Sequence, residues 1–226
     1  MSLKPNALPQ DALVPEAVVS ELAQTFLQQP IEFEDINWVV ALSGGADSVA
    51  LLHLLAHSTV ANRLRCMHVN HGLQADAANW DAFCRSKADA FYIPYQSIAV
   101  NISSEALGSL GPEAAARQAR YNALLGSMES NEVLLTAHHA NDQLETILYR
   151  LERGAELKGL AGIRTLSSRS VNNVEHLIAR PLLAWQKEDL ERYLKAQQQT
   201  WVEDPSNKQD VFRRNFYRNN LTPQLP

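Results

Sequence analysis

The chain has 226 residues, of which 46% are apolar, enough for one large domain or a main domain with a small appendage. Its formal net charge of -5 argues against a broadly basic nucleic-acid-binding surface, so any RNA contact is expected to be local. Charges or glycine interrupt every run that approaches membrane length, and no basic segment precedes an apolar core at the N-terminus. We therefore expect a cytoplasmic protein without membrane contact.

Short apolar runs alternate with longer amphipathic segments, which predicts βαβ units and a doubly wound, mostly parallel α/β sheet. An opening helix at residues 15–29 carries Val18, Leu22 and Phe26 at helical spacing, and residues 1–35 are assigned to this outer helix. Strands are predicted at residues 38–42, 64–69, 92–100, 133–137 and 177–183. Helices are predicted at residues 47–57, 74–91, 112–128, 141–153 and 186–199, and residues 167–173 are interpreted as a polar loop.

A glycine-rich loop, Ser43-Gly44-Gly45-Ala46-Asp47-Ser48, joins the first predicted strand to a predicted helix. Adjacent glycines let the backbone bring N–H groups close to an anion, and the helix N-terminus adds the positive end of its dipole. The loop has neither the lysine of a Walker A motif nor the G-x-G-x-x-G spacing. The alternative is an ordinary turn in which Ser43 caps the helix. In the functional interpretation Ser43 and Ser48 donate to phosphate oxygens, and Asp47 acts through Mg²⁺.

The string Ser-Gly-Gly-x-Asp-Ser resembles the PP-loop of the ATP pyrophosphatases, which hold the pyrophosphate end of ATP and release or transfer AMP. This resemblance implies an adenine nucleotide alpha hydrolase-like fold. It also implies that residues 43–48 bind ATP.

The helix predicted at residues 141–153 carries two carboxylates near its start, Asp142 and Glu145. They are three positions apart, and we place them opposite an apolar face formed by Leu144, Ile147, Leu148 and Leu151. Two carboxylates that converge would suit an ammonium group. The alternative is that acidic residues in a first turn complement the helix dipole, worth about 0.3–1 kcal/mol each.

Histidines and arginines supply further candidates. Four histidines, His68, His71, His138 and His139, could suggest a zinc site, but no carboxylate stands at zincin spacing from them. Contact with nucleotide or substrate is the preferred interpretation, because strand ends line ligand clefts in open α/β sheets. Core packing or capping is expected to explain at least two of the four. Arg117 and Arg120 could clamp phosphate or the reacting base, or lie on a solvated helix face with Arg120 paired to an acid.

A basic cluster close to the end of the chain is interleaved with aromatic residues. Arg213, Arg214 and Arg218 stand among Phe212, Phe216 and Tyr217, a pattern that fits backbone contacts and stacking on an exposed base. The alternative is an amphipathic closing helix that docks Phe216 on the domain.

Six motifs in order are similar to those of the tRNA(Ile)-lysidine synthetases, from about residue 36 to the end. They lie at residues 68–74, 115–121, 136–146, 180–183, 201–207 and 213–219. The resemblance implies ATP and lysine as substrates, with Mg²⁺, and a tRNA(Ile) with a CAU anticodon as partner. The wobble cytidine is adenylated at its C2 carbonyl oxygen, and the lysine ε-amine then displaces AMP.

The resemblance also implies residue roles. Asp47, Arg117 and Arg120 would be catalytic, and Asp142 and Glu145 would bind lysine. Contacts in the cleft would come from His71 and His139, and contacts to tRNA from Arg213, Arg214 and Arg218. Two positions depart from the family pattern, because Gln74 replaces the usual Arg and Asn141 replaces the usual Asp. Residues 36–220 would form the catalytic domain and residues 221–226 would begin a linker to further tRNA-binding domains.

Two rival functions stay open. An RNA thiolase also adenylates a base but needs catalytic cysteines or an iron–sulfur cluster; Cys66 and Cys84, without a C-x-x-C pair, are instead expected to be buried thiols. A non-catalytic nucleotide- or RNA-binding module on the same fold is the other rival, which the acidic residues of the site argue against. The oligomeric state, including a homodimer, is left open by the sequence.

Overall fold

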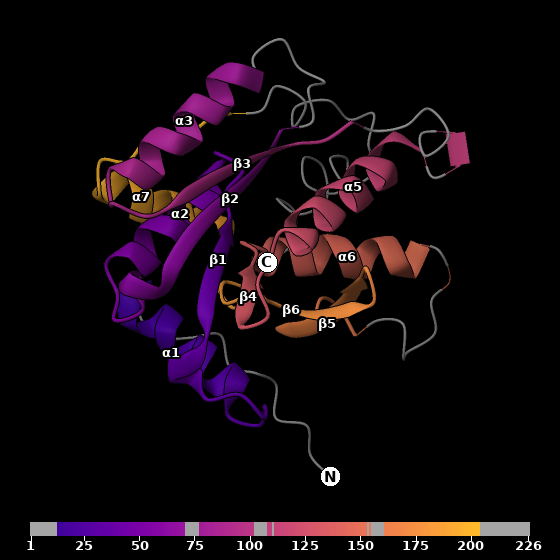
Figure 1. Ribbon diagram of the computed structural model, residues 1–226, viewed down its shortest axis with the longest axis horizontal. Coiled ribbons are helices and arrows are strands. Elements are labelled where there is room, and N and C mark those ends of the chain that lie inside the picture. The colour runs from indigo at the N-terminus through magenta and orange to yellow at the C-terminus, as the bar shows by residue number, and fades with distance from the viewer. Residues whose placement is uncertain are drawn as a thin grey trace.

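A six-stranded sheet forms the centre of the computed structural model, which describes residues 13–70, 77–101, 108–109, 111–152, 154 and 161–203 (Figure 1). The strand order is β3-β2-β1-β4-β6-β5, and all neighbours are parallel except β5 and β6. The strands are β1 (Asn37–Ala41), β2 (Leu64–Asn70), β3 (Tyr95–Ala99), β4 (Glu132–Leu135), β5 (Leu166–Val171) and β6 (Val174–Ala179). The predicted doubly wound, mostly parallel sheet is confirmed.

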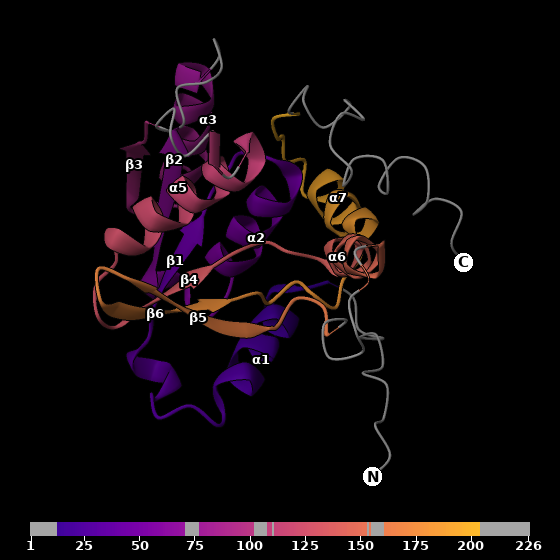
Figure 2. The same ribbon diagram turned by 90° about the vertical axis from the view of Figure 1, so that its right-hand side faces the viewer.

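Helices cover both faces of this sheet. Those over the faces are α1 (Pro15–Phe26), α2 (Ala46–Ala56), α3 (Ala77–Asp89), α5 (Pro112–Gly126) and α7 (Lys187–Ala196), with short 3₁₀ turns at Phe33–Asp35 and Ala61–Arg63. A further helix, α6 (Ala140–Glu152), does not lie on the sheet (Figure 2). Because side chains alternate along a strand, Trp38 and Val40 pack toward α1, α2, α3 and α7, whereas Val39 packs toward α5. Helix α2 lies between the sheet and α1 and α7, which explains why its sequence is apolar all round.

The predicted polar loop at residues 167–173 is wrong, because most of this segment is strand β5. It pairs antiparallel with β6 at the edge of the sheet, and Ser168 and Ser170 are exposed where burial is not required. Asn172 and Asn173 form the connection and both have positive φ, 52° and 62°, as in a two-residue type I′ hairpin. Strand β6 accordingly begins before the predicted residue 177 and ends at Ala179.

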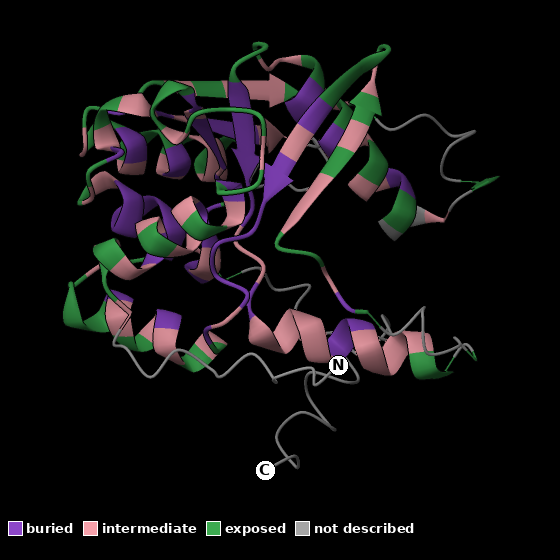
Figure 3. Cartoon of the chain, turned by 90° about the horizontal axis from the view of Figure 1, so that it is seen from below, coloured by how far each residue is buried: buried purple, intermediate pink, exposed green. Residues whose placement is uncertain are grey.

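Helix α6 lies beyond the carboxyl ends of the strands and away from the sheet (Figure 2), and its start lies next to the start of α7. The side chains that it buries are those of Glu145 and Thr146, whereas most of its length is half-buried (Figure 3). Leu151, on the predicted apolar face, is 50% exposed. Leu144, Ile147 and Leu148 on the same face are half-buried, so the predicted apolar face is only partly covered within the described part of the chain.

Some predicted features lie outside the described residues: His71, Gln74, Arg213, Arg214 and Arg218. The part of the chain that the structure describes contains no helix long and apolar enough to span a membrane.

Candidate functional site

The loop between β1 and α2 is held by its own two serines. The Ser48 hydroxyl donates to the carbonyl oxygen of Gly45 at 3.0 Å and accepts from the backbone N–H of Ser43 at 3.1 Å. The two hydroxyl oxygens are 3.0 Å apart, which leaves the Ser43 hydroxyl to donate to Ser48. Gly45 is the N-cap of α2, so the alternative in which Ser43 caps this helix does not hold.

Gly44 occupies a position that only glycine suits. Its φ is +87°, and a β-carbon there would lie 3.2 Å from Sγ of Cys84. Its carbonyl oxygen accepts a hydrogen bond of 2.9 Å from the backbone N–H of Val202. The carbonyls of Gly44 and Gly45 are therefore occupied, whereas the N–H groups in the first turn of α2 have no acceptor within the helix. This polarity suits an anion.

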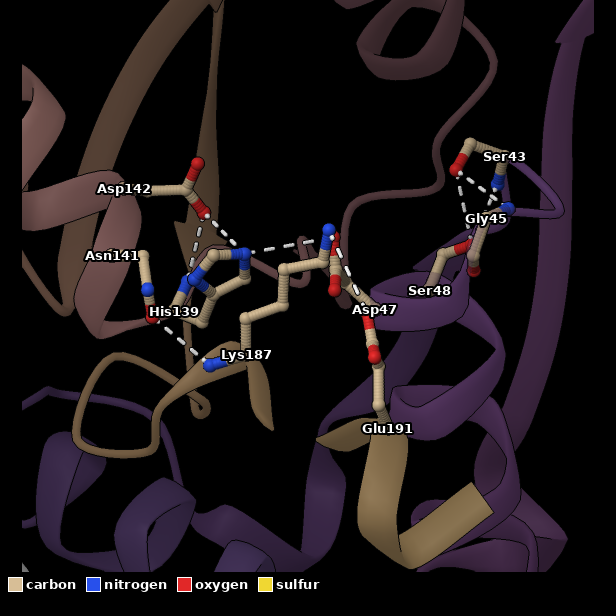
Figure 4. A network of polar contacts seen from close by, with 9 residues as sticks. All are labelled: Ser43, Gly45, Asp47, Ser48, His139, Asn141, Asp142, Lys187 and Glu191. Atoms are coloured by element: carbon tan, nitrogen blue, oxygen red, sulfur yellow. Dashed lines mark hydrogen bonds and ion pairs between the residues drawn. The ribbon is translucent and has the colours of Figure 1, made fainter. Parts of the chain in front are cut away.

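His139 joins this loop to the start of α6 (Figure 4). Its Nε2 lies 3.6 Å from Oδ2 of Asp47 and 3.5 Å from Oδ2 of Asp142, and the residue is only 1% exposed. The same Asp142 oxygen accepts the backbone N–H of His139 at 2.9 Å. One buried imidazole thus brings together two carboxylates that are far apart in the sequence.

The other oxygen of Asp47 has a distinct environment. Among the described residues, Asp47 Oδ1 is buried and has no hydrogen-bond donor. A buried carboxylate oxygen without a donor is costly, and oxygen of this kind is the preferred ligand of hard divalent cations. Asp47 therefore has one oxygen beside His139 and one available to a cation.

The two predicted ammonium ligands on α6 differ in burial. Asp142 stands at the third position of α6 and accepts the N–H of the residue before the helix, a local role in the first turn that is compatible with the helix-dipole alternative. Glu145, one turn further, is 2% exposed. A charge complementing only the helix dipole has no need of such burial, which favours a more specific role for Glu145.

Arg117 and Arg120 gather around one aromatic ring on α5. Their guanidinium carbons lie 5.2 and 5.7 Å from the ring centroid of Tyr121, and Arg169 of β5 approaches the same ring at 5.3 Å. The solvated-face alternative does not describe this arrangement, because both side chains are half-buried.

Arg180, which the sequence reasoning quoted only as part of a motif, extends this basic group. It directly follows β6, is 8% exposed, and donates to the carbonyl of Arg164 at 2.8 Å and to Ser167 Oγ at 3.0 Å. Burial first, and then the charges of Arg180, Arg117 and Arg120, hold the pKa of His138 well below its usual value. The sequence signal that could have identified Arg180 as a site residue was its position at the carboxyl end of a predicted parallel strand.

The remaining histidine and cysteine candidates have structural partners. His68 Nδ1 lies 2.8 Å from the carbonyl oxygen of Leu42, and His138 Nδ1 lies 2.9 Å from Thr136 Oγ1, so two of the four histidines have local contacts, as expected. Cys66 and Cys84 are free and buried, which confirms the prediction of buried thiols. Burial raises the pKa of both thiols to about 12.

Comparison with known families identifies the loop. Residues 16–225 match the model of the PP-loop domain family. The chain belongs to this PP-loop family. The family assignment covers the whole arrangement from α1 through α7, and it agrees with the resemblance drawn from residues 43–48.

Several curated proteins similar to this PP-loop domain are named tRNA(Ile)-lysidine synthase. The tRNA(Ile)-lysidine synthase of Haemophilus ducreyi is 42% identical over 205 residues, which cover 91% of this chain and 44% of that protein. The protein of the same name from Pseudomonas aeruginosa is 44% identical over 192 residues, covering 84% and 42%. The chain therefore spans less than half the length of these relatives.

Solved structures agree on the PP-loop fold. The U34-tRNA thiolase NcsA of Methanococcus maripaludis, a structure that contains a [4Fe-4S] cluster, has a TM-score of 0.61 at 15% identity, covering 91% of this chain and 74% of that one. The NMN synthetase of Francisella tularensis has a TM-score of 0.51 at 14% identity, covering 91% and 84%. At these identities the similarity concerns the fold alone.

Proposed function

We propose that this PP-loop domain catalyses lysidine formation on a tRNA(Ile) with a CAU anticodon. The C2 carbonyl oxygen of the wobble cytidine attacks the α-phosphorus of ATP, and pyrophosphate leaves. The ε-amine of lysine then attacks C2, the C2–O bond breaks, AMP departs and the amine proton passes to solvent. The observation that carries the proposal is the His139 bridge, which joins the phosphate loop at Asp47 to the acidic start of α6 at Asp142.

ATP is assigned to the loop at residues 43–48. Backbone N–H groups at the start of α2 would contact the pyrophosphate end, and the Ser43 hydroxyl could join them by turning from Ser48 to a phosphate oxygen, while Ser48 keeps the loop in shape. Mg²⁺ fits this site because Asp47 offers a buried oxygen that receives no hydrogen bond from any residue that the structure describes. When bound, the metal would neutralise phosphate charge, and Asp47 is the residue that would hold it.

Lysine is assigned to the start of α6. Asp142 and Glu145 would bind an ammonium group of the substrate, and His139 holds Asp142 in place through its backbone N–H and its ring. Because the ring also reaches Asp47, the lysine site and the phosphate site share one support. That proximity suits a reaction in which the amine attacks a base activated by AMP.

The RNA is assigned to two basic regions. Arg117 and Arg120 on α5 would contact phosphate or the reacting cytidine, and both lie close enough to His138, as Arg180 does, to contribute to its lowered pKa. Arg213, Arg214 and Arg218 would contact the tRNA backbone, with Phe216 and Tyr217 available for base stacking. The partners proposed for the protein are tRNA, ATP and lysine, all in the cytoplasm.

The decisive experiment incubates the protein with ATP, Mg²⁺, lysine and a tRNA bearing a CAU anticodon, followed by mass spectrometry of the wobble nucleoside. We expect a mass gain equal to lysine minus water, absent when the wobble base is uridine and absent with Asp47→Ala. AMP formation without the mass gain would retain adenylation and reject lysine as second substrate. Absence of both products would contradict the proposal.

A thiolase is the main rival, and its product differs in the same assay. Replacement of the base oxygen by sulfur would give a different mass. The thiolate is the reactive form of cysteine, and the raised pKa of Cys66 and Cys84 disfavours it for the two cysteines of the chain. The lysidine assignment is therefore preferred.

A further inference from the structure

Lys187, the first residue of α7, is fixed beside the candidate site through its backbone. Its N–H donates to Oδ1 of Asn141 at 3.0 Å, and the N–H of Ala140 donates to the carbonyl oxygen of Trp185 at 2.8 Å. The starts of α6 and α7 are therefore linked by two hydrogen bonds. Asn141, which departs from the usual family residue, is one of the groups that make this link.

The side chain of Lys187 extends from α7 toward Asp47 and His139 (Figure 4). Its ammonium Nζ pairs with Oε1 of Glu191, one turn along α7, at 3.7 Å. This pair is weak, because both side chains are about one-third exposed, at 34% and 33%, and the separation is long. Glu191 also has Lys195 Nζ at 4.0 Å, so it keeps a cation nearby if Lys187 leaves.

The phosphate loop needs positive charge that its own residues do not supply. Residues 43–48 contain no Lys or Arg, and their carboxylate, Asp47, is assigned to Mg²⁺, so a side-chain cation for the phosphates has to come from elsewhere in the fold. A lysine is a compact charge on a flexible stem, which can change partners by rotation and is a common phosphate ligand. Lys187 is such a group, anchored by its backbone and directed at Asp47.

We propose that Lys187 is a phosphate-binding residue of this site. When ATP occupies the PP-loop, its ammonium leaves Glu191 and donates to a phosphate oxygen of the nucleotide. This assignment rests on the proposed use of ATP. Lys187 thereby adds a cation from α7 to a loop formed by β1 and α2.

The test measures the affinity of the purified chain for Mg²⁺ and a non-hydrolysable ATP analogue by calorimetry. We expect Lys187→Met to raise Kd about tenfold or more, the effect typical of losing a charge-assisted hydrogen bond. Lys195→Met is the matched control, since it removes the other cation beside Glu191, and it should change Kd less than about twofold. Lys187→Arg should recover part of the affinity because it restores the charge.

Adenosine separates a phosphate contact from a structural role, because it shares the base and sugar but has no phosphate. Adenosine affinity should be equal in the wild-type chain and Lys187→Met. An equal loss for adenosine, or a Kd for the ATP analogue that matches that of Lys195→Met, would overturn the assignment while leaving ATP use intact. Failure of the wild-type chain to bind the ATP analogue would reject the proposed function and the assignment together.

Discussion

A β-carbon on Gly44 would lie 3.2 Å from Sγ of Cys84, so the sulfur on α3 fills the space beside the phosphate loop. Because Gly44 also has a φ of +87°, Gly44→Ala combines backbone strain with a steric conflict. We expect it to lower the free energy of unfolding by about 1–3 kcal/mol and to weaken ATP binding. Urea denaturation and calorimetry provide the two measurements.

Gly45→Ala is the matched control for that substitution. Gly45 has a φ of -72°, and a β-carbon there would have only Ser43 Oγ nearby, at 3.6 Å. We expect Gly45→Ala to lower the free energy of unfolding by no more than about 1 kcal/mol, the cost of a poorer N-cap without backbone strain or a steric conflict. Equal losses in the two variants would show that the geometry at Gly44 is not the constraint described.

Asp142→Asn tests the lysine site. The amide can still accept the N–H of His139, but it removes the charge that an ammonium group would contact. The Michaelis constant for lysine should rise far more than that for ATP, measured by AMP release in the presence of tRNA. An equal rise in both constants would refute the assignment.

Asp189→Asn supplies the corresponding control. Asp189 accepts the backbone N–H of Gln186 at 3.1 Å at the start of α7, the same capping arrangement that Asp142 has in α6. Asp189→Asn should destabilise its helix about as little as Asp142→Asn does, while the Michaelis constant for lysine stays unchanged.

Arg65 and Glu132 form a two-fold contact between β2 and β4, with N···O distances of 2.5 and 2.6 Å. Burial alone would raise the pKa of Glu132, but the hydrogen bonds from Arg65 and the Glu129 N–H outweigh it and lower the pKa. Its stabilising contribution is therefore complete above the unfolded value of about 4.5 and is lost as the pH falls through the lower folded value.

Arg65→Met should leave the Glu132 carboxylate without its charged partner and cost about 2–4 kcal/mol at neutral pH. Chemical denaturation at pH 7 and at pH 3 checks this. The difference in the free energy of unfolding between wild type and Arg65→Met should be smaller at pH 3 than at pH 7. An equal difference at both pH values would contradict the role of the ion pair.

His53 predicts a second dependence on pH. Burial first, then the charges of His57 and Lys87, lower the pKa of His53 to about 4 from 6.5. Between these values the unfolded chain binds a proton that the folded chain does not, so stability falls as the pH falls from about 6.5 to about 4. The melting temperature of His53→Gln should fall less steeply with decreasing pH in this window than that of wild type. An equal dependence of the melting temperature on pH in the two proteins would contradict the prediction.

The basic cluster near the end of the chain makes a prediction for RNA. Changing Arg214 and Arg218 to Ala should weaken tRNA binding and reduce the slope of log affinity against log salt by about one per lost phosphate contact. Filter binding across a salt series measures both quantities. Unchanged affinity would count against this cluster as an RNA contact.

Local signals predicted much of the fold. Strands β1, β2 and β4 are within about two residues of their predicted bounds because buried parallel strands have continuous apolar runs. Strand β5 was not predicted, since its serines lack an apolar pattern; the Asn172-Asn173 pair was the usable signal for a hairpin. The packing of α6 could not be predicted, because which face of a helix is buried depends on neighbours distant in the sequence.

The candidate site shows the same limit. The residues of the phosphate loop are contiguous, so residues 43–48 could be recognised as a unit. The meeting of Asp47 and His139 depends on how the segments after β1 and β4 are arranged, and periodicity does not encode that arrangement. Roles assigned from sequence to Arg213, Arg214 and Arg218 stay predictions.

The hydrogen bond from Val202 to Gly44 defines how short a working fragment can be. The sheet is complete at Ala179 and the last described helix ends at Ala196, so a fragment ending at residue 198 would retain every described strand and helix. It would nevertheless lose the donor that holds the carbonyl of Gly44. Truncation for crystallisation or for screening of nucleotide analogues should therefore keep Val202, because a shorter fragment would report the affinity of a loosened loop.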